Sequence, residues 1–523
     1  MFLPALSPAS VLAAVFPLLL VLGLMIGRRW GGSQAGPAGW LAAAGIAVGF
    51  FGAPGPLLLV AAGRALLLAL YVLYVIWAAL LFYHLVNEAG GFKVIAGALS
   101  RLAGDVPAQA LLLAWVFGSF LQGASGFGVP AAVVGPLLLG LGLSPDRAAV
   151  VALLGHGWAV TFGSLGSSFF ALIAASGLEG KALAGPAALQ LGLACLLCGA
   201  AVLWLSGGAA AFRRRWREWL LVGGLMAGVQ YALATAGLWS LAALGAALAG
   251  LATLLVWLRQ AGRGASDLAD NSSSRPPGRT ALVTALVPYG LLTVVVLVGQ
   301  LVLAEPLSAL TLEAGFPAVE TAFGWRTPAG RGQPISVLGH PGALLLYSSL
   351  LSYLWLRARP GAEQGFSAAA AVRKTLRASI KPTLGIITLL AMALTMQLAG
   401  MTQLLAFSLS QAAGPLFPVV SPFLGALGAV MTGSNTNSNV VFGALQLQTA
   451  GALGLPASLI LATQTAGAAM GSIFAPAKVI LAASTIEGAE EGRVLRLALV
   501  YGLLITAALA LITWLGWRLG FGS

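Results

Sequence analysis

Long apolar runs are the feature that most limits what this chain can fold into. Segments of about 18 or more residues with few charges recur from one end of the sequence to the other, which is the length an α-helix needs to cross a bilayer. Hydrophobic residues make up 59% of the 523 positions and charged residues only 8%, against about 25% in a typical soluble domain. A transmembrane β-barrel would show short alternating segments instead. The sequence therefore predicts an all-α polytopic membrane protein with about 12–14 transmembrane or re-entrant segments.

The basic residues predict how the chain is oriented in the membrane. The net charge of +13 comes from 27 Lys and Arg against 14 Asp and Glu, and these basic residues lie between the apolar runs. Because basic loops stay on the cytoplasmic side, we interpret them as orientation signals and expect no nucleic-acid partner. The first apolar run, about residues 11–27, is followed by Arg28 and Arg29, the reverse of a signal peptide. We therefore expect a multi-pass protein of the cell (inner) membrane with its N-terminus outside.

The same count of basic residues assigns a side to each later loop. Lys93, Arg101 and the arginines at 213–217 are predicted inside, as are two basic linkers at 259–279 and 357–381. The segment 305–341, which holds Glu305, Glu313 and Glu320, is predicted outside. The crossings expected between these loops are about 185–206, 219–237, 239–258, 281–303 and 383–405.

Two parts of the chain repeat at a distance of about 310 residues. The run beginning at Gly118 matches the run beginning at Gly428, and the closing phrase at Ala174 matches that at Ala482. The charge count makes the first unit begin inside and the second outside, which describes an inverted-topology repeat of the kind found in secondary transporters. Chance similarity in a chain rich in Ala, Gly and Leu is the alternative. The predicted divisions are N-terminal helices 1–101, a first unit 102–206, scaffold helices 207–381 and a second unit with the C-terminal helix 382–523.

Each unit contains a window that predicts a broken helix. Residues 118–130 hold four glycines and a proline, which weaken a helix and expose its backbone. Residues 432–446 begin with a run of glycine and polar residues in which Asn435, Asn437 and Asn439 are three of only five asparagines in the chain. Non-helical backbone is tolerated at membrane depth only where protein or water satisfies it. The alternatives are close packing through small residues for the first window and a surface turn for the second.

These windows indicate a site for a small organic anion. A half-helix that starts inside the membrane directs unpaired N–H groups at the site, which favours a carboxylate, while neutral amides and hydroxyls can recognise a neighbouring hydroxyl group. The candidate substrate-binding residues are Gln122, Ser125, Gly126, Thr432, Ser434, Asn435, Asn437, Asn439, Gln464, Ser472 and Lys478.

Two ionisable residues lie inside the apolar runs of the units. Lys478 is a candidate counter-ion for the carboxylate, and snorkelling to the interface is its alternative role. His156 is a candidate for proton coupling, and a packed neutral histidine is the alternative. No metal-ligand cluster or catalytic constellation is visible, so we expect no cofactor, no metal site and no enzyme.

The same windows resemble the lactate permease family, whose members carry L-lactate, and in several cases D-lactate or glycolate, together with protons. Residues 118–130 are similar to the family pattern G-[AS]-F-L-E-G-A-A-G-F-G-x-P, and residues 159–166 to P-V-A-F-G-A-x-G. Residues 432–446 resemble T-G-S-D-T-S-S-N-x-L-F-x-x-L-Q, and residues 421–425 also fit. The resemblance implies a transporter of small 2-hydroxymonocarboxylates coupled to protons.

The chain departs from the family pattern at polar positions. Gln122 stands where the pattern has Glu, Asn435 where it has Asp, and His156 where it has Asn. The lysine that the family has before an S-P-Q turn matches Ser472, with Lys478 six residues later. Proton symport would then run through His156 or Lys478, or by carriage of the protonated acid.

The sequence thus predicts a proton symporter for L-lactate, D-lactate or glycolate whose partners are the anion, protons and the lipid bilayer, and it makes no prediction about oligomeric state. A sodium-coupled or uncoupled carrier of another small organic anion is the second hypothesis. A channel would show conductance and no counterflow.

Overall fold

The computed structural model describes residues 7–28, 30–99, 105–126, 129–260, 278–358 and 367–520. Several positions discussed above lie outside this part: Arg29, Arg101, residues 127–128 of the first window, and residues 261–277 and 359–366 of the two basic linkers. Most of the described chain is helical, and nine helical stretches in it are long and apolar enough to cross a membrane. A tenth candidate is a pair, residues 145–159 and 163–176, bent by 54° at a short break. The protein is therefore an all-α polytopic membrane protein, as its apolar runs predict.

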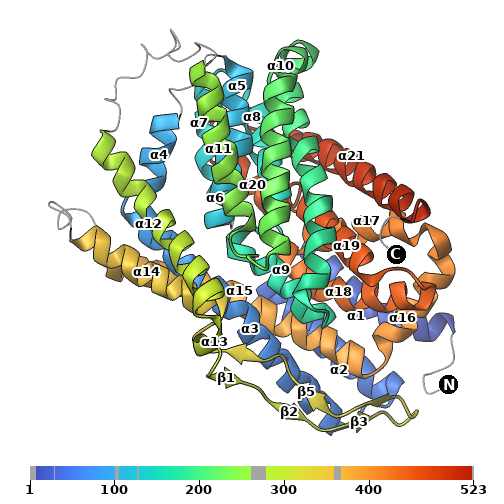
Figure 1. Ribbon diagram of the computed structural model, residues 1–523. Helices are drawn as coiled ribbons and strands as arrows, with labels where there is room; N and C mark the ends of the chain where they lie inside the picture. Colours follow the sequence, from blue (N-terminus) through green and yellow to red (C-terminus); the bar gives the residue numbers. More distant parts are fainter. Residues whose placement is uncertain are drawn as a thin grey trace.

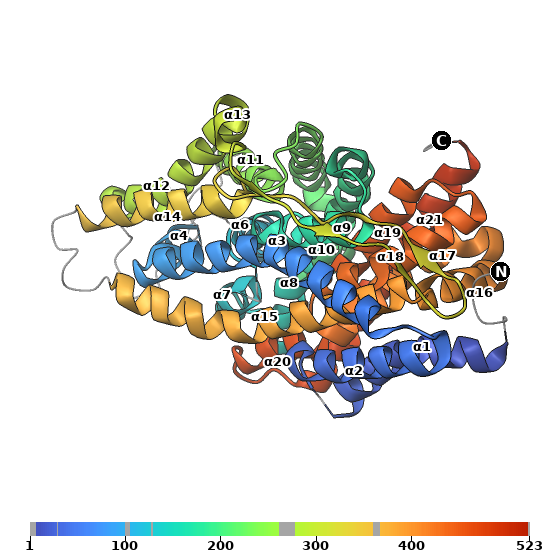
Figure 2. The same cartoon turned by 90° about the horizontal axis from the view of Figure 1, so that it is seen from below.

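Four long helices lie together along one side of the molecule (Figure 2). They are α1 (Pro8–Gly27), α2 (Gly32–Phe51), α3 (Gly55–Glu88) and α15 (Ala368–Leu398). Helix α2 fits closely between its neighbours because it carries glycine at the contacts: a Cβ on Gly36 would lie 2.2 Å from Oγ1 of Thr388, and one on Gly39 2.4 Å from Val21. Residues 368–381 of the second basic linker belong to α15 and are helical.

The predicted first unit is built from short helical pieces. After α4 (Gly91–Leu99), they are α5 (Val106–Ala110), the π-helical turn η1 (Leu111–Phe117), α6 (Gly118–Ala124), α7 (Val129–Gly140), α8 (Pro145–Gly155), the short turn η2 (Gly157–Ala159) and α9 (Gly163–Ser176). Pieces α5 to α6 continue in one direction as far as Ala124, and α7 then packs against both α6 and α8. The helix breaks therefore occur inside two apolar segments.

Helix α10 (Gly180–Thr235) turns back on itself at Gly207 and Gly208 and is followed by α11 (Ala242–Gln260). Gly208 has a φ of 63°, which glycine adopts without strain. The two arms of α10 pack together, since a Cβ on Gly223 would lie 2.6 Å from Leu196 (Figure 1). The arginines at 213–217 are thus helical and lie just after this turn.

Asp105 connects the start of α5 to this turn of α10. Its carboxylate accepts hydrogen bonds from Arg214 at 2.6 Å, from Arg215 at 2.9 Å and from the N–H of Ala108 at 2.9 Å. Burial opposes its ionisation, but the hydrogen bond from Arg215 and the other two contacts outweigh burial and lower the pKa of Asp105 below its usual value.

A long two-stranded ribbon covers one end of the helices between α12 and α14 (Figures 1 and 2). Helix α12 (Arg279–Leu297) leads through η4 (Val298–Val302) and α13 (Ala304–Leu307) into β1 (Thr311–Leu312), β2 (Gly315–Phe316), β3 (Val319–Glu320), β4 (Arg326–Thr327), β5 (Gly330–Arg331) and β6 (Ile335–Ser336), and α14 (Pro341–Arg357) follows. The strands pair antiparallel as β1 with β6, β2 with β5 and β3 with β4. Near the tip, the N–H of Ala322 bonds the carbonyl of Gly52 at 2.8 Å, which fixes the ribbon to the end of α2.

The predicted second unit repeats the pattern of short helices. Its elements are α16 (Met401–Ala413), η6 (Gly414–Leu416), α17 (Phe417–Thr432), α18 (Asn435–Leu453), α19 (Ala457–Gly471), α20 (Pro476–Ser484) and the C-terminal α21 (Glu491–Arg518). Helices α17 and α19 approach to backbone contact, because a Cβ on Gly467 would lie 2.0 Å from the carbonyl oxygen of Pro422. This unit packs against the first one through α18 on α9.

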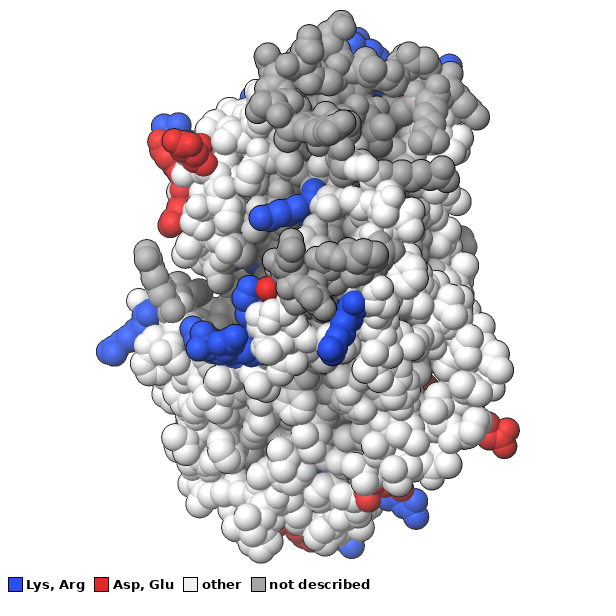
Figure 3. All heavy atoms as spheres, turned by 90° about the vertical axis from the view of Figure 1, so that its left-hand side faces the viewer, with Lys and Arg blue, Asp and Glu red and all other residues white. Residues whose placement is uncertain are grey.

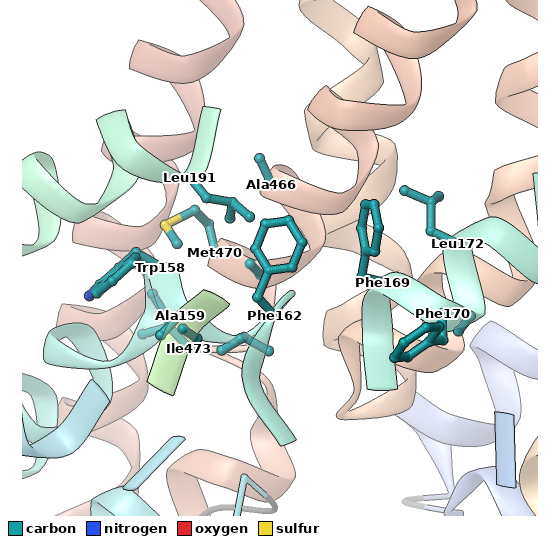
Figure 4. Packing of buried hydrophobic residues seen from close by; sticks show 14 of the residues in the cluster. Trp158, Ala159, Phe162, Phe169, Phe170, Leu172, Leu191, Ala466, Met470 and Ile473 are labelled. Carbon is teal, nitrogen blue, oxygen red and sulfur yellow. The ribbon is translucent and has the colours of Figure 1, made fainter. Parts of the chain in front are cut away.

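Apolar side chains occupy both the interior and the outside of the described chain. Figure 4 shows Trp158 and Phe162 packed with Met470 and Ile473 of the second unit, at the place where α8 gives way to α9. On the outside, side chains such as Leu59 are 75% exposed, and Figure 3 shows that most of the described surface on that face carries no charge. Such a surface suits a lipid environment.

Candidate functional site

The first window contains a helix break that only glycine permits. Helix α6 ends at Ala124, and the hydroxyl of Ser125 donates to the carbonyl of Leu121 at 2.7 Å. Gly126 has a φ of +66°, and a Cβ there would lie 1.7 Å from Oγ of Ser164. The end of α6 therefore lies directly against the start of α9.

A second break lies directly against the first. Ser164 and Leu165, at the start of α9, have φ values of 47° and 56°, which are unusual for residues with side chains. Gln122 packs onto this turn, since a Cβ on Gly163 would lie 2.8 Å from its Nε2. The Oε1 atom of Gln122 is buried and has no hydrogen-bond partner. The site thus holds a free acceptor between the two breaks.

The second window is the start of a helix. Gly433, with a φ of +69°, ends α17, and the hydroxyl of Ser434 accepts from the N–H of Asn437 at 3.3 Å as the N-cap of α18. Oγ1 of Thr432 lies 2.8 Å from the carbonyl oxygen of Gly428 and 3.0 Å from that of Ser434. A Cβ on Gly433 would touch Ala477 at 3.6 Å, so this break meets the one between α19 and α20.

Six buried side chains form a hydrogen-bonded group that we call the polar network: Thr161, Ser168, Asn435, Thr436, Asn439 and Thr465. The Nδ2 group of Asn435 donates to Thr161 at 2.9 Å, and Thr161 lies 3.1 Å from the hydroxyl of Thr465.

Asn439 and Ser168 extend the network along α18 and α9. Nδ2 of Asn439 donates to Thr465 and to the carbonyl of Ser168, both at 2.9 Å, and the Ser168 hydroxyl lies 2.9 Å from that of Thr436. The Oδ1 atom of Asn439 is buried without a partner. The network therefore joins the turn before α9, α9 itself, α18 and α19, and it retains an acceptor for a ligand.

Four of these residues were not among the sequence candidates: Thr161, Ser168, Thr436 and Thr465. Thr161 lies within the 159–166 motif, and Thr465 follows Gln464 directly. Both are polar residues within apolar runs, and this was the only feature of the sequence that could have identified them as site residues.

Of the eleven sequence candidates, Asn435 and Asn439 belong to the polar network and nine do not; Asn437 and Gln464 are two of these nine. Asn437 is half-buried and faces α2, where a Cβ on Gly32 would lie 3.4 Å from its Nδ2. Gln464 donates to Ser438 at 3.1 Å, and its oxygen accepts from Gln446, which also contacts Ser421. This second group of amides and hydroxyls connects α17, α18 and α19.

Lys478 and Ser472 form a pair near the α19–α20 break, and His156 precedes Gly157, where a Cβ would lie 2.3 Å from Ile473 of the same break. Nζ of the half-buried Lys478 donates to the hydroxyl of Ser472 at 3.1 Å. His156 is 1% exposed, and its Nδ1 lies 2.7 Å from the carbonyl of Ala152. Because a carbonyl only accepts, Nδ1 carries a proton in this contact. In the described part of the chain, no three His, Cys, Asp or Glu side chains lie close enough to hold a metal ion.

The chain matches known proteins over almost its whole length. The family model described as L-lactate permease matches residues 10–520. A glycolate permease, GlcA, of Escherichia coli K12 is 28% identical, covering 96% of this chain and 95% of its own. An L-lactate permease of Bacillus subtilis is 27% identical, covering 97% and 95%.

Among solved structures, the chain is similar to the YdaH transporter of Alcanivorax borkumensis, with 13% identity, a TM-score of 0.47 and coverage of 86% of this chain and 85% of the other. The family match, which spans the helix breaks and the polar network alike, identifies this chain as a multi-pass membrane protein of the L-lactate permease family.

Proposed function

We propose that this protein is a secondary transporter that carries a small 2-hydroxymonocarboxylate across the cell membrane together with a proton and leaves the solute chemically unchanged. L-lactate is the first expected substrate, and D-lactate and glycolate are the others. The names of the relatives, L-lactate permease and glycolate permease, support this substrate class.

The polar network is the observation on which this proposal depends. A hydroxy acid needs donors for its carboxylate and partners for its hydroxyl. The first turn of α18 offers backbone N–H groups at Asn435 and Thr436, and Lys478 offers a positive charge near the adjoining break. The free acceptors on Gln122 and Asn439 suit the substrate hydroxyl. Neutral donors and acceptors with one positive charge beside them favour a small polar monoanion.

Reciprocal packing of the two predicted units supports an inverted repeat at 102–206 and 382–523. Helix α9 of the first unit packs on α18 of the second, and α20 of the second packs on α7 of the first. In the same way α10 packs on α19, and α21 packs on α8. Elements at equivalent positions in the two units thus make equivalent contacts with the other unit, an arrangement that favours alternating access around a fixed site.

We assign proton coupling to His156, with Lys478 as the counter-ion of the carboxylate. The ring of His156 has one nitrogen held by Ala152 and the other left to bind a proton. Substrate arrival would offset the charge of Lys478 and so favour protonation of the imidazole. The alternative is that the protein carries the protonated acid and uses no titrating side chain. Experiment must distinguish this from coupling through His156.

Uptake of labelled L-lactate and glycolate into proteoliposomes tests the function. The protein is purified, reconstituted, and given an inward proton gradient, an inward sodium gradient or neither. Accumulation driven only by protons supports the proposal, whereas accumulation driven by sodium replaces it with the second hypothesis. Current without counterflow exchange would indicate a channel.

The orientation is tested with single cysteines on the two predicted faces. Ala329→Cys on the exposed ribbon should react with a membrane-impermeant maleimide in intact cells, and Ala369→Cys at the start of α15 should react only after permeabilisation. The opposite pattern would reverse the predicted topology. Because native Cys195 and Cys198 are buried, the unmodified protein is the control for background labelling.

A further inference from the structure

A cavity of about 230 Å³ lies beneath the ribbon, away from the polar network. Its walls come from α3, α9, α15 and α18, and residues 331–333 of the ribbon cover it. The polar side chains around it are Arg64, Ser176, Arg331, Gln333 and Gln397. Its size suits a molecule of a few heavy atoms rather than a lipid chain.

Arg64 gives this cavity a positive charge that no carboxylate of the described residues neutralises. Its Nη2 lies 3.4 Å from the carbonyl oxygen of Pro328, and its guanidinium stands over the ring of Phe316 at 5.4 Å. Its Nε is buried without a hydrogen-bond partner, and no acidic group within the described ranges forms an ion pair with it. Arg331, by contrast, bonds Glu313 at 2.8 Å. An unpaired arginine on a membrane helix, facing a cavity, suggests an anion site.

The ribbon is closely fitted over Arg64. A Cβ on Gly332 would lie 2.4 Å from Leu67, and one on Gly63 would lie 3.0 Å from Phe316. Strands β2 and β5 therefore rest directly on α3, and the guanidinium is held between the ribbon and the helix at the edge of the cavity.

The floor of the cavity is one helical turn from the polar network. On α18, Val440 and Ala444 line the cavity, and Thr436 of the network lies one turn before Val440 on the same face. On α9, Ala175 and Ser176 line it, and Leu172 separates them from Ser168. Both Leu172 and Val440 are almost fully buried. Two apolar side chains thus separate the cavity from the Ser168–Thr436 pair.

We propose that this cavity is an outer vestibule in which Arg64 binds the carboxylate of the incoming substrate before it reaches the polar network. This inference rests on the proposed function for the identity of the substrate. Separation of α9 from α18 at Leu172 and Val440 would open the path, and Arg64 would raise the local concentration of the anion on that side.

The first test is the kinetics of uptake by charge variants. Arg64→Gln should raise the KM for L-lactate or glycolate about tenfold with little change in kcat, and Arg64→Lys should recover part of the loss because it restores the charge without the planar fork. Arg326→Gln is the matched control. It removes an arginine that lies on the ribbon and does not line the cavity, so the KM should be unchanged. An unchanged KM in Arg64→Gln would overturn the proposal.

A second variant keeps the test independent of the folding of Arg64→Gln. Ala393→Phe places a large ring in the cavity from α15 and leaves Arg64 in place, so it should also raise the KM. If both arginine variants are misfolded and Ala393→Phe transports normally, the vestibule is excluded.

Direct binding separates failure of this proposal from failure of the proposed function. If the unmodified protein moves neither L-lactate nor glycolate, thermal stabilisation by acetate, pyruvate and formate still reports on a carboxylate site. Stabilisation that is lost in Arg64→Gln and kept in Arg326→Gln supports the vestibule. Stabilisation that is equal in all three proteins, or absent from the unmodified protein, rejects it.

Discussion

The side chain of Asn435 donates a 2.9 Å hydrogen bond to the hydroxyl of Thr161, which lies 274 residues earlier in the chain. Both residues are buried, and the same hydroxyl lies 3.1 Å from that of Thr465. One hydroxyl has one proton and two lone pairs, so Thr161 can accept from Asn435 and donate to Thr465. A single threonine therefore joins the turn before α9 to both α18 and α19.

Removal of the Thr161 hydroxyl should lower the free energy of unfolding, although it changes the shape of the side chain very little. Thr161→Val keeps the shape of the side chain but leaves the buried amide of Asn435 without its acceptor, at an expected cost of about 1–3 kcal/mol. Thermal unfolding in detergent, followed by uptake in proteoliposomes, measures the effect. Thr161→Ser keeps the hydroxyl and should unfold close to the unmodified protein. Equal stability of Thr161→Val and Thr161→Ser would mean that the hydrogen bond contributes little.

The sequence predicted a helix break in each of the two windows, but not the breaks before α9 and between α19 and α20, nor which asparagines act together. Asn435, Asn437 and Asn439 were grouped because they are close in the sequence. In the structure they form the first residues of α18, and helical geometry places Asn435 and Asn439 on one face, one turn apart, with Asn437 pointing elsewhere. Because we interpreted residues 432–446 as a broken helix, the sequence could not predict that Asn437 points away from Asn435 and Asn439.

The hydroxyl residues of the network were beyond sequence reasoning for a different reason. Most Ser and Thr side chains in these helices bond their own backbone, as Thr449 does to the carbonyl of Leu445 at 2.8 Å. Thr465 also stands between a glutamine and an alanine, but its hydroxyl accepts a hydrogen bond from Asn439. Only the packing of α18 against α9 and α19 distinguishes the two cases.

Neutralisation of Lys478 tests its role as the counter-ion. Lys478→Met should lose substrate-induced thermal stabilisation while the unliganded protein unfolds normally, because the methionine keeps the apolar stem and removes the charge that reaches Ser472. Lys181→Met, at an exposed position at the start of α10, is the control for loss of one positive charge. Retained stabilisation by L-lactate in Lys478→Met would remove this residue from the site.

Replacement of His156 tests the assignment of proton coupling. In His156→Asn the side chain at this position can no longer bind a proton, so accumulation driven by a proton gradient should fall at least tenfold while counterflow exchange continues. Uptake with and without the gradient, in the same proteoliposomes, gives both quantities. His156→Gln should behave in the same way. Undiminished proton-driven accumulation in either variant would favour carriage of the protonated acid.

The stabilising contacts of Asp105 should depend on pH. Its pKa is lowered in the folded protein, so its contribution is fully present above the unfolded value of 3.8 and is lost as the pH falls through the folded pKa. Asp105→Asn should therefore be destabilised relative to the unmodified protein at pH 7, and the two should converge in acid. Thermal unfolding across the pH range down to about pH 3 measures the difference. A difference that stays constant with pH would exclude the carboxylate as its source.

Close backbone contact between α17 and α19 should make Gly467 intolerant of any side chain. A Cβ at this position would lie 2.0 Å from the carbonyl oxygen of Pro422, and the neighbouring contacts at Gly425 and Gly471 leave the two helices no room to separate locally. Gly467→Ala should therefore lower the unfolding temperature clearly and reduce uptake, because α19 also carries Thr465 of the polar network.

Gly451→Ala is the matched control: this glycine lies within α18 with nothing near its Cβ position, and alanine is the better helix former by about 1 kcal/mol. The two substitutions add the same methyl group, so opposite changes in stability are expected, and a loss of stability in both would point to a general intolerance of the fold rather than to the contact with Pro422.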